Sequence, residues 1–314
     1  MSWWMPPHSE FGRIAAHFFL IALPASDPGS ASVSRPWSRL GDSEQTESAM
    51  KFQTLVAATA AVLLSAAAAQ AAQVAALWGD NTISIVDTNA KKVVKTWKIQ
   101  GMTGKVLGID VRPADNMLYA VGSDGGIFTV DLATGKATMK SKLEKMLPAG
   151  AWVSVDFNPV ADRMRLIGSD GSNLRVNVDD GKVTVDGELK FAETDMHKGE
   201  KPNVVGGAYI NSVKGAKETA LYDIDATIGA LFKQAPPNEG ILSAVGKLGI
   251  KPTTNIAFDI WSDGQGKNDA WLLTGDWLHS VDLATGKATP AVQIKGISGV
   301  RDIAILPAES MKSM

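Results

Sequence analysis

The residues best suited to chemistry are four aspartates, each midway in a short apolar segment such as LGIDV or VSVDF: Asp110, Asp156, Asp259 and Asp302. Carboxylates that converge can bind a hard cation such as Ca²⁺, which takes several oxygen ligands. Two carboxylates about 5–9 Å apart can instead catalyse glycoside hydrolysis. A third interpretation is structural, because a feature that recurs in each repeat often bonds neighbouring repeats together. No cofactor other than Ca²⁺ is indicated.

Two arginines and a tryptophan form a second candidate binding group. Arg165 and Arg175 fall on segments that we expect to face one another, with Asp156 and Asp162 close in sequence. Guanidinium groups can bind a carboxylate, a phosphate or a sugar acid through paired hydrogen bonds. The alternative is an internal Arg–Asp network. Trp152 precedes the segment that holds Asp156, where its ring can stack on a sugar or peptide or pack between repeats.

Composition excludes several other classes of function. The 314 residues contain no cysteine, so disulfides, thiolate metal sites and cysteine nucleophiles are excluded. The net charge of −2 gives no electrostatic basis for binding nucleic acid. Of the four histidines, His197 follows Glu193 and Asp195, where it is either a metal ligand or, as we favour, a solvated loop residue.

Internal repeats determine the elements that position these residues. The phrase VDLATGKAT occurs at 130–138 and again at 281–289. Residues 107–138 align without a gap with residues 153–184, an offset of 46 (153 − 107). Two weaker copies begin at Val74 and Val204. The chain therefore contains five versions of one unit of about 45 residues, a period typical of propeller blades.

Each unit has the pattern of four short antiparallel strands. LGIDV and VSVDF alternate apolar with small or polar residues, which is the period of a β-strand. SDG and ATGK supply turn residues, and Pro113 ends the first strand. The fold class that we predict is all-β, a five-bladed β-propeller with four-stranded antiparallel blades.

The two ends of the repeat region complement each other. The first copy lacks its leading strand, and the chain finishes with GVRDIAILP (299–307), which resembles that strand and places Asp302 in the position of Asp110 and Asp156. We expect the C-terminal strand to complete blade 1 and close the ring, which removes exposed sheet edges. In propellers the first strand lines the central channel, so the four aspartates are expected to converge there.

The N-terminal region is expected to lie outside the propeller. Residues 50–71 have a basic start, an apolar run and the small-residue site Ala69-Gln70-Ala71, the pattern of a secretory signal peptide. We interpret residues 1–49 as a disordered upstream extension from a mis-called start, residues 72–307 as one propeller domain and residues 308–314 as a tail. Cleavage near Ala71-Ala72 predicts a periplasmic or secreted protein, with no membrane span in the mature chain.

The motifs LGIDVRPADNMLYAVGS, VDFNPVADRMRLI, KPNVVGGAY, LYDID and PPNEGIL resemble a bacterial exported family described only as a domain of unknown function, number four-three-nine-four. The resemblance covers about residues 74–306 and implies a propeller-like fold and export, but no reaction. We expect a ligand-binding or protein-interaction module, with a small molecule, a glycan or a protein as its partner. The alternatives are a carboxylate-based hydrolase acting on glycans and a structural envelope protein.

Overall fold

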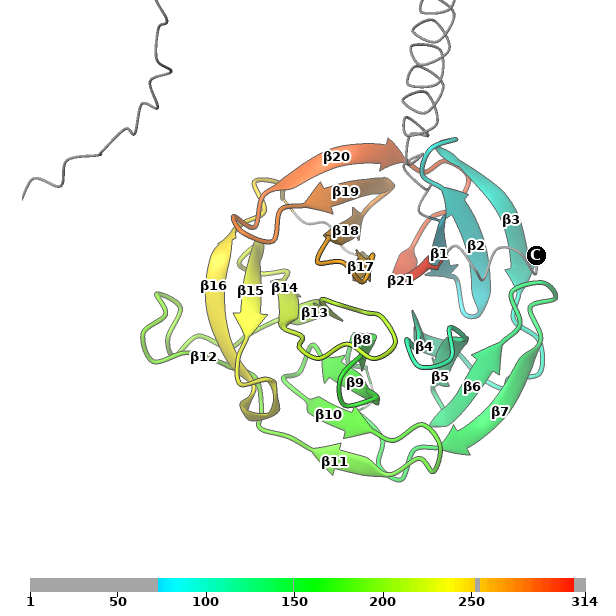
Figure 1. Ribbon diagram of the computed structural model, residues 1–314, viewed down its shortest axis with the longest axis horizontal. Helices are drawn as coiled ribbons and strands as arrows, with labels where there is room; N and C mark the ends of the chain where they lie inside the picture. The colour runs from blue at the N-terminus through cyan, green and yellow to red at the C-terminus, as the bar shows by residue number, and fades with distance from the viewer. Residues whose placement is uncertain (1–72, 149, 252–254, 308–314) are drawn as a thin grey trace, which may run out of the picture. The chain divides into compact units, whose positions relative to one another are not determined.

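The computed structural model describes residues 73–148, 150–251 and 255–307, which form five small sheets around a central axis (Figure 1). The predicted five-bladed β-propeller is confirmed. The expected extension (1–49), signal peptide (50–71) and tail (308–314) lie outside the described residues. No helix in the described ranges is long and apolar enough to cross a membrane.

Every blade has four antiparallel strands, and its first strand lies nearest the axis (Figure 1). Blade 1 consists of β21 (Val300–Leu306), β1 (Gln73–Trp78), β2 (Thr82–Asp87) and β3 (Lys92–Lys98). Blade 2 consists of β4 (Val106–Val111), β5 (Leu118–Gly122), β6 (Gly126–Val130) and β7 (Ala137–Lys142). Blade 3 consists of β8 (Val153–Asn158), β9 (Arg163–Gly168), β10 (Asn173–Val176) and β11 (Val183–Val185).

Blade 4 consists of β13 (Val204–Tyr209), β14 (Leu221–Asp225), β15 (Ala230–Gln234) and β16 (Ile241–Lys247). It carries one addition that the repeats did not predict, because the short strand β12 (Lys190–Phe191) pairs in parallel with β16. A single 3₁₀ turn, η1 (Pro237–Glu239), precedes β16. Blade 5 consists of β17 (Ile256–Ser262), β18 (Asn268–Thr274), β19 (Trp277–Val281) and β20 (Ala288–Gln293).

The ring closes through blade 1, as predicted. Strand β21 pairs antiparallel with β1, with Asp302 opposite Leu77 and Ala304 opposite Ala75. The last strand of the propeller therefore hydrogen-bonds to the first, and the inner edge of blade 1 is occupied by the chain's own end. Strand β21 therefore takes the innermost place in blade 1, as β4, β8, β13 and β17 do in the other blades.

The apolar core lies between the blades rather than within any one of them. Leu77 and Ile85 of blade 1 pack with Ile109 and Leu118 of blade 2 in one buried cluster. Because both faces of a blade are covered by its neighbours, strands such as β5 are buried along their whole length. That explains why LYAVG is almost continuously apolar where a half-exposed strand would alternate.

The repeated sequence VDLATGKAT contains a turn that packs against the neighbouring blade. Its glycine, Gly135, has φ +74°, a left-handed conformation that favours glycine, and a Cβ there would lie 2.0 Å from the Trp97 ring of the preceding blade. The equivalent Gly181 has φ +77°, and its Cβ would lie 1.9 Å from the Lys142 carbonyl oxygen. The turn between the third and fourth strands of these blades thus both bends sharply and abuts the outer strand of its neighbour.

Candidate functional site

The candidate site is one level of the channel wall, made by one residue from each innermost strand. The backbone N–H of Phe157 donates to Asp110 (2.8 Å), that of Tyr209 to Asp156 (3.2 Å) and that of Ile305 to Asp259 (2.6 Å). Each bond runs from one blade to the next, and the donors directly follow Asp156, Ala208 and Ala304. The five positions of this level are therefore Asp110, Asp156, Ala208, Asp259 and Ala304.

Two of the three aspartates of this level each accept a second backbone N–H, from the residue that follows them. The N–H of Val111 donates to Asp110 and that of Ile260 donates to Asp259, both at 2.6 Å. Five backbone N–H groups thus meet six carboxylate oxygens. The sixth oxygen, Oδ2 of Asp156, accepts none of these five bonds. Backbone hydrogen bonds, most of them between blades, therefore account for five of the six oxygens and do not account for Oδ2 of Asp156.

Asp302 belongs to a different level, and its predicted equivalence with Asp110 and Asp156 is wrong. It accepts the N–H of Ile109 at 2.8 Å, as the hydroxyl of Ser154 accepts that of Gly207. Ile109 and Gly207 lie two residues before Val111 and Tyr209, the residues that follow Asp110 and Ala208 in the same strands. Asp302 is therefore displaced from the level of Asp110 by about two residues along the channel, roughly 6.6 Å. Asp302 bonds blade 1 to blade 2 and does not join the other three carboxylates.

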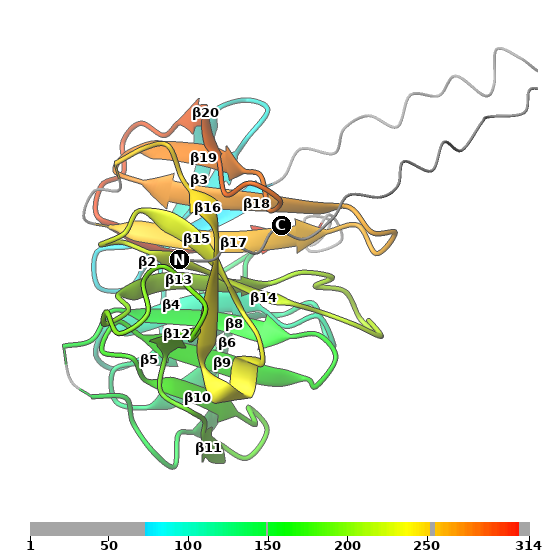
Figure 2. The same cartoon turned by 90° about the vertical axis from the view of Figure 1, so that its left-hand side faces the viewer.

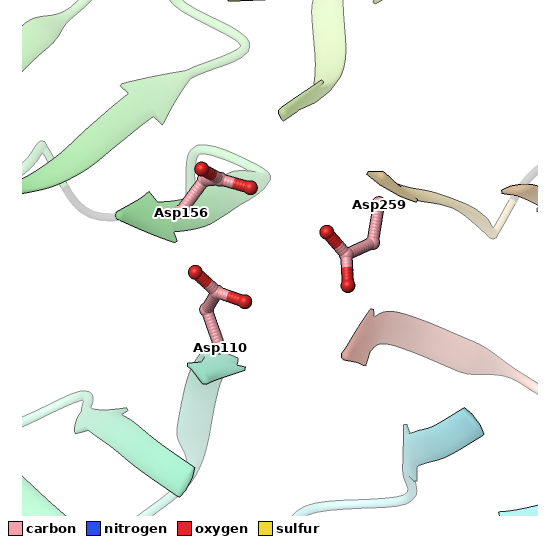
Figure 3. Close-up of side chains that lie close together, drawn as sticks. All are labelled: Asp110, Asp156 and Asp259. Atoms are coloured by element: carbon pink, nitrogen blue, oxygen red, sulfur yellow. The ribbon is translucent and has the colours of Figure 1, made fainter. Parts of the chain in front are cut away.

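Asp110, Asp156 and Asp259 point toward one another across the channel (Figure 3). One carboxylate oxygen from each lies within 4.8 Å of the others. Burial raises the pKa of Asp110 and Asp156 well above the usual value, and the neighbouring carboxylates raise it further. Burial raises the pKa of Asp259 to about 6. We call these three residues the carboxylate triad, a site that favours protons or a cation.

A cleft of about 200 Å³ opens onto two members of this triad, Asp110 and Asp259, where the innermost strands end. Asp110 and Asp259 line it together with Ser212, Lys214, Trp261 and Pro307. The hairpin loops of blades 4 and 5 project on this side of the propeller (Figure 2). Side chains from blades 1, 2, 4 and 5 therefore meet at the mouth of the channel.

The loops beside the cleft are held by hydrogen bonds between side chains and backbone. Asn211 and Asn268 pair reciprocally, at 2.8 and 3.2 Å. The hydroxyl of Ser262 accepts the N–H of Ser212 at 2.9 Å. These bonds connect blades 4 and 5, the junction at which Ala208 provides no carboxylate, and they fix one wall of the cleft.

Arg165 and Arg175 are part of an internal network between blades 3 and 4. Arg165, 2% exposed, donates to Asp186 (2.6 Å), to Asn173 and Asn238, and to the Tyr209 hydroxyl. Arg175 donates to both oxygens of the same Asp186. Neither arginine lines the cleft, so the Arg–Asp network interpretation describes their contacts.

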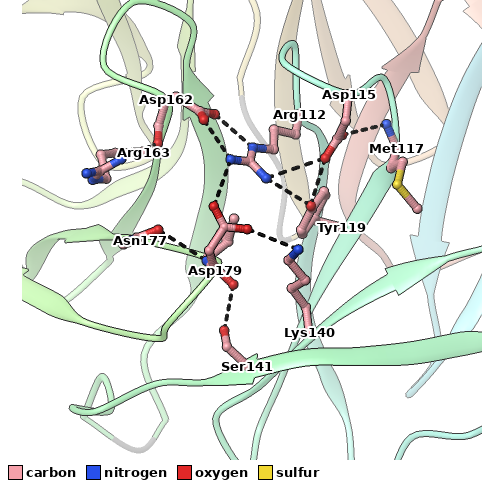
Figure 4. A network of polar contacts seen from close by, with 11 residues as sticks. Arg112, Asp115, Met117, Tyr119, Lys140, Ser141, Asp162, Arg163, Asn177 and Asp179 are labelled. Carbon is pink, nitrogen blue, oxygen red and sulfur yellow. Dashed lines mark hydrogen bonds and ion pairs between the residues drawn. The ribbon is translucent and has the colours of Figure 1, made fainter.

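A second ion network joins blades 2 and 3 (Figure 4). Arg112 donates to both oxygens of Asp162, at 2.8 and 2.6 Å, and also contacts Asp115 and Asp179. The hydrogen bonds that Arg112 donates to Asp162 raise the pKa of Arg112. The pairing of Asp162 with Arg112, rather than with Arg165, was not apparent from the sequence.

Two other candidates lie apart from the cleft. Trp152 is half-buried before β8, at the opposite end of the innermost strand from Asn158, and it does not line the cleft. His197 is not a solvated loop residue, because its ring packs against Phe191 and Phe232 and its Nδ1 lies 3.2 Å from Glu200. The metal ligation considered for His197 has no support in these contacts.

The cleft residues that sequence reasoning missed are Ser212, Lys214 and Trp261. Trp261 follows Asp259 by two residues, and this spacing places both on the same face of β17. The spacing was a usable signal for Trp261. Ser212 and Lys214 lie in the loop between β13 and β14, which is longer than the equivalent loops of blades 2, 3 and 5, so comparing repeats gave no signal for them.

The family described as a domain of unknown function, DUF4394, matches residues 82–304. The chain belongs to this family. The match covers most of the propeller, including all three residues of the triad. No curated protein matches the sequence.

Several solved structures are similar in fold. A protein of unknown function from Bacteroides caccae is 12% identical, with a TM-score of 0.41 over 76% of this chain and 99% of that chain. One from Bacteroides thetaiotaomicron is 15% identical, with a TM-score of 0.44 over 75% and 68%. A chain of the nidogen/laminin complex is 12% identical, with a TM-score of 0.47 over 76% and 99%. Identities this low carry no information about a shared ligand.

Proposed function

We propose that this DUF4394 protein is an exported binding module that holds a divalent cation, Ca²⁺ by preference, at the carboxylate triad beneath the channel-mouth cleft. The observation that carries the proposal is the convergence of three buried aspartates in the channel wall, one oxygen of each within 4.8 Å of the others, while Oδ2 of Asp156 accepts none of the five backbone N–H bonds. A cation bound there would offset the mutual repulsion of three buried carboxylates.

The ligand set favours Ca²⁺ over Mg²⁺. Ca²⁺ takes six to eight oxygen ligands in a flexible geometry, whereas Mg²⁺ demands a near-ideal octahedron and usually keeps several waters. One oxygen from each of the three carboxylates lies within 4.8 Å of the others, which allows all three to contact one ion after small side-chain adjustments. Because each carboxylate offers about four lone-pair sites, an oxygen that accepts an N–H can still coordinate an ion. The cleft leaves the remaining coordination positions to water or to a bound molecule.

The test is thermal unfolding of the full chain in millimolar CaCl₂, in MgCl₂ and in chelator. We expect Ca²⁺ to raise the melting temperature more than Mg²⁺ does, because ligands that bind only the native state stabilise it. Asp156→Asn should abolish the rise. Asp302→Asn is the matched control, since it alters an equally buried blade-to-blade aspartate outside the triad and should keep the rise. Identical melting in Ca²⁺ and in chelator would remove the proposal.

The proposed site also has a pH signature. Burial raises the pKa of Asp259 to about 6, and Asp110 and Asp156 are raised as well, so cation binding must displace protons. The Ca²⁺-induced rise in melting temperature should therefore be larger near pH 8 than near pH 5. A rise that does not change between these values would mean that Ca²⁺ binds elsewhere.

One observation favours the glycan hydrolase as a second candidate. Asp110 and Asp259 both line the cleft, and Asp259, with a pKa of about 6, is suited to act as a general acid. A screen with nitrophenyl glycosides tests this function. Turnover that Asp259→Asn abolishes and Asp302→Asn preserves would support the hydrolase, and a lack of turnover would favour the binding module.

Export is the remaining part of the proposal, and it is supported by the residues of segment 50–71. Expression in a Gram-negative host should yield a periplasmic or secreted protein whose sequenced N-terminus lies near Ala72. Replacing Leu63 with arginine in the apolar run should retain the protein in the cytoplasm. A cytoplasmic protein that keeps residues 50–71 would contradict export.

A further inference from the structure

We propose that the channel-mouth cleft binds a small polyhydroxylated carboxylate, of the size and chemistry of a monosaccharide acid, whose oxygens complete the coordination of the triad's cation. This inference rests on the proposed function and extends it to the organic ligand. It is carried by the lining of the cleft, which combines acidic, basic and apolar groups in separate places.

With the proposed cation bound, the charges of the cleft favour a ligand with an anionic group. Lys214 is exposed at the cleft and makes no ion pair within the described residues, whereas the other charged lining residues, Asp110 and Asp259, belong to the triad. With a divalent ion on the triad, the floor of the cleft presents an electrophilic centre with open positions. A ligand carboxylate can coordinate the ion and accept a hydrogen bond from the Lys214 ammonium at the same time. Charge-assisted hydrogen bonds of this kind are stronger than those between neutral groups.

The walls and the size of the cleft limit the rest of the ligand. Trp261, Pro113 and Pro307 provide apolar surface against which the carbon face of a sugar ring can pack. The hydroxyl of Ser212 and the backbone around it supply polar contacts. A volume of about 200 Å³ is below the 300–1,000 Å³ of sites that enclose drug-sized ligands. The cleft therefore suits a single sugar acid or the acidic end of a chain, and an internal glycan segment is too large for it.

The experiment is calorimetric titration of the full chain with galacturonate in millimolar CaCl₂, with galactose as the neutral ligand of the same shape. We expect galacturonate to bind with a Kd below about 1 mM and galactose to bind at least about tenfold more weakly. Chelator should abolish binding of galacturonate. Lys214→Met should weaken galacturonate binding about tenfold, and Lys217→Met, in the same loop but away from the cleft, should leave it unchanged.

The outcomes separate this inference from the one on which it rests. If Ca²⁺ raises the melting temperature but galacturonate at tens of millimolar gives no binding heat, the inference is overturned and the cation site stands. Binding that Lys214→Met does not weaken, or equal binding of galactose, overturns it as well. If Ca²⁺ itself has no effect on melting, both proposals fall together.

Discussion

Asp223 provides the sharpest prediction about stability. It lies on β14 opposite Gly207, is 0% exposed, and neither of its carboxylate oxygens has a hydrogen-bond donor in the described structure. Burial raises its pKa well above the usual value, and the nearby Arg165 only partly opposes that effect. Arg165 is already bonded to four other side chains, so it cannot neutralise Asp223 directly.

The sign of the effect follows from the raised pKa. The stability that a neutral Asp223 contributes is present in full below its unfolded pKa of 3.8 and is lost as the pH rises through the higher folded value. A buried polar group without a partner costs about 1–3 kcal/mol, and a charged group costs more. We therefore expect Asp223→Asn to raise the free energy of unfolding by about 1–3 kcal/mol near pH 8 and to change it little near pH 4.

The assay is urea unfolding of the wild type and the variant at a series of pH values, followed by tryptophan fluorescence. Asp225→Asn is the matched control, because Asp225 is equally buried on the same strand but accepts the N–H groups of Asn203 (2.7 Å) and Ile228 (2.8 Å). An amide has only one acceptor oxygen, so this variant should lose stability. If Asp223→Asn is less stable than the wild type near pH 8, or if the difference does not depend on pH, the reasoning about Asp223 is wrong.

Two further predictions concern contacts between blades. Gly181→Ala should lower the free energy of unfolding by about 1–3 kcal/mol in urea titrations, because the new Cβ would lie 1.9 Å from the Lys142 carbonyl oxygen. Gly199→Ala should lower the free energy of unfolding by less, because Gly199 has a similar φ of +84° but no atom lies within 4 Å of the new Cβ. Equal losses for the two variants would mean that backbone strain, and not the contact with Lys142, causes the destabilisation. Arg165→Met should cost about 3 kcal/mol in the same assay, because it removes one partner of the buried Asp186. Arg175→Met should cost clearly less, since Arg175 is 33% exposed, and the reverse order would contradict the network described here.

The fold could be read from the sequence because each unit repeats its turns and strands. The glycine of ATGK recurs since the same turn abuts the preceding blade at Gly135 and again at Gly181. The closure by residues 299–307 was predictable because an incomplete first unit and a spare final strand complement each other.

The level of Asp302 was not predictable from the same patterns. A shift of two residues keeps every side chain on the same face of a strand, so alternation of apolar residues cannot distinguish the two registers. Only the hydrogen bonds between blades show that Ala304, and not Asp302, shares the level of Asp110. The triad was therefore predicted in its members but with one aspartate too many.

The polar partners of the candidate site depend on parts of the chain that do not repeat. Lys214 reaches the cleft from the loop between β13 and β14, which is longer in blade 4 than in blades 2, 3 and 5, and Arg112 pairs with Asp162 across a blade junction. Pairings of this kind depend on how neighbouring blades are placed, and strand periodicity contains no information about that placement.

The most direct test of the account is X-ray diffraction from crystals of the protein grown with CaCl₂, with anomalous data that identify the ion. We expect a Ca²⁺ peak about 2.3–2.6 Å from one oxygen each of Asp110, Asp156 and Asp259, with further ligands on the side of the cleft. A channel in which the three carboxylates hydrogen-bond to one another or to water, with no anomalous peak between them, would contradict it.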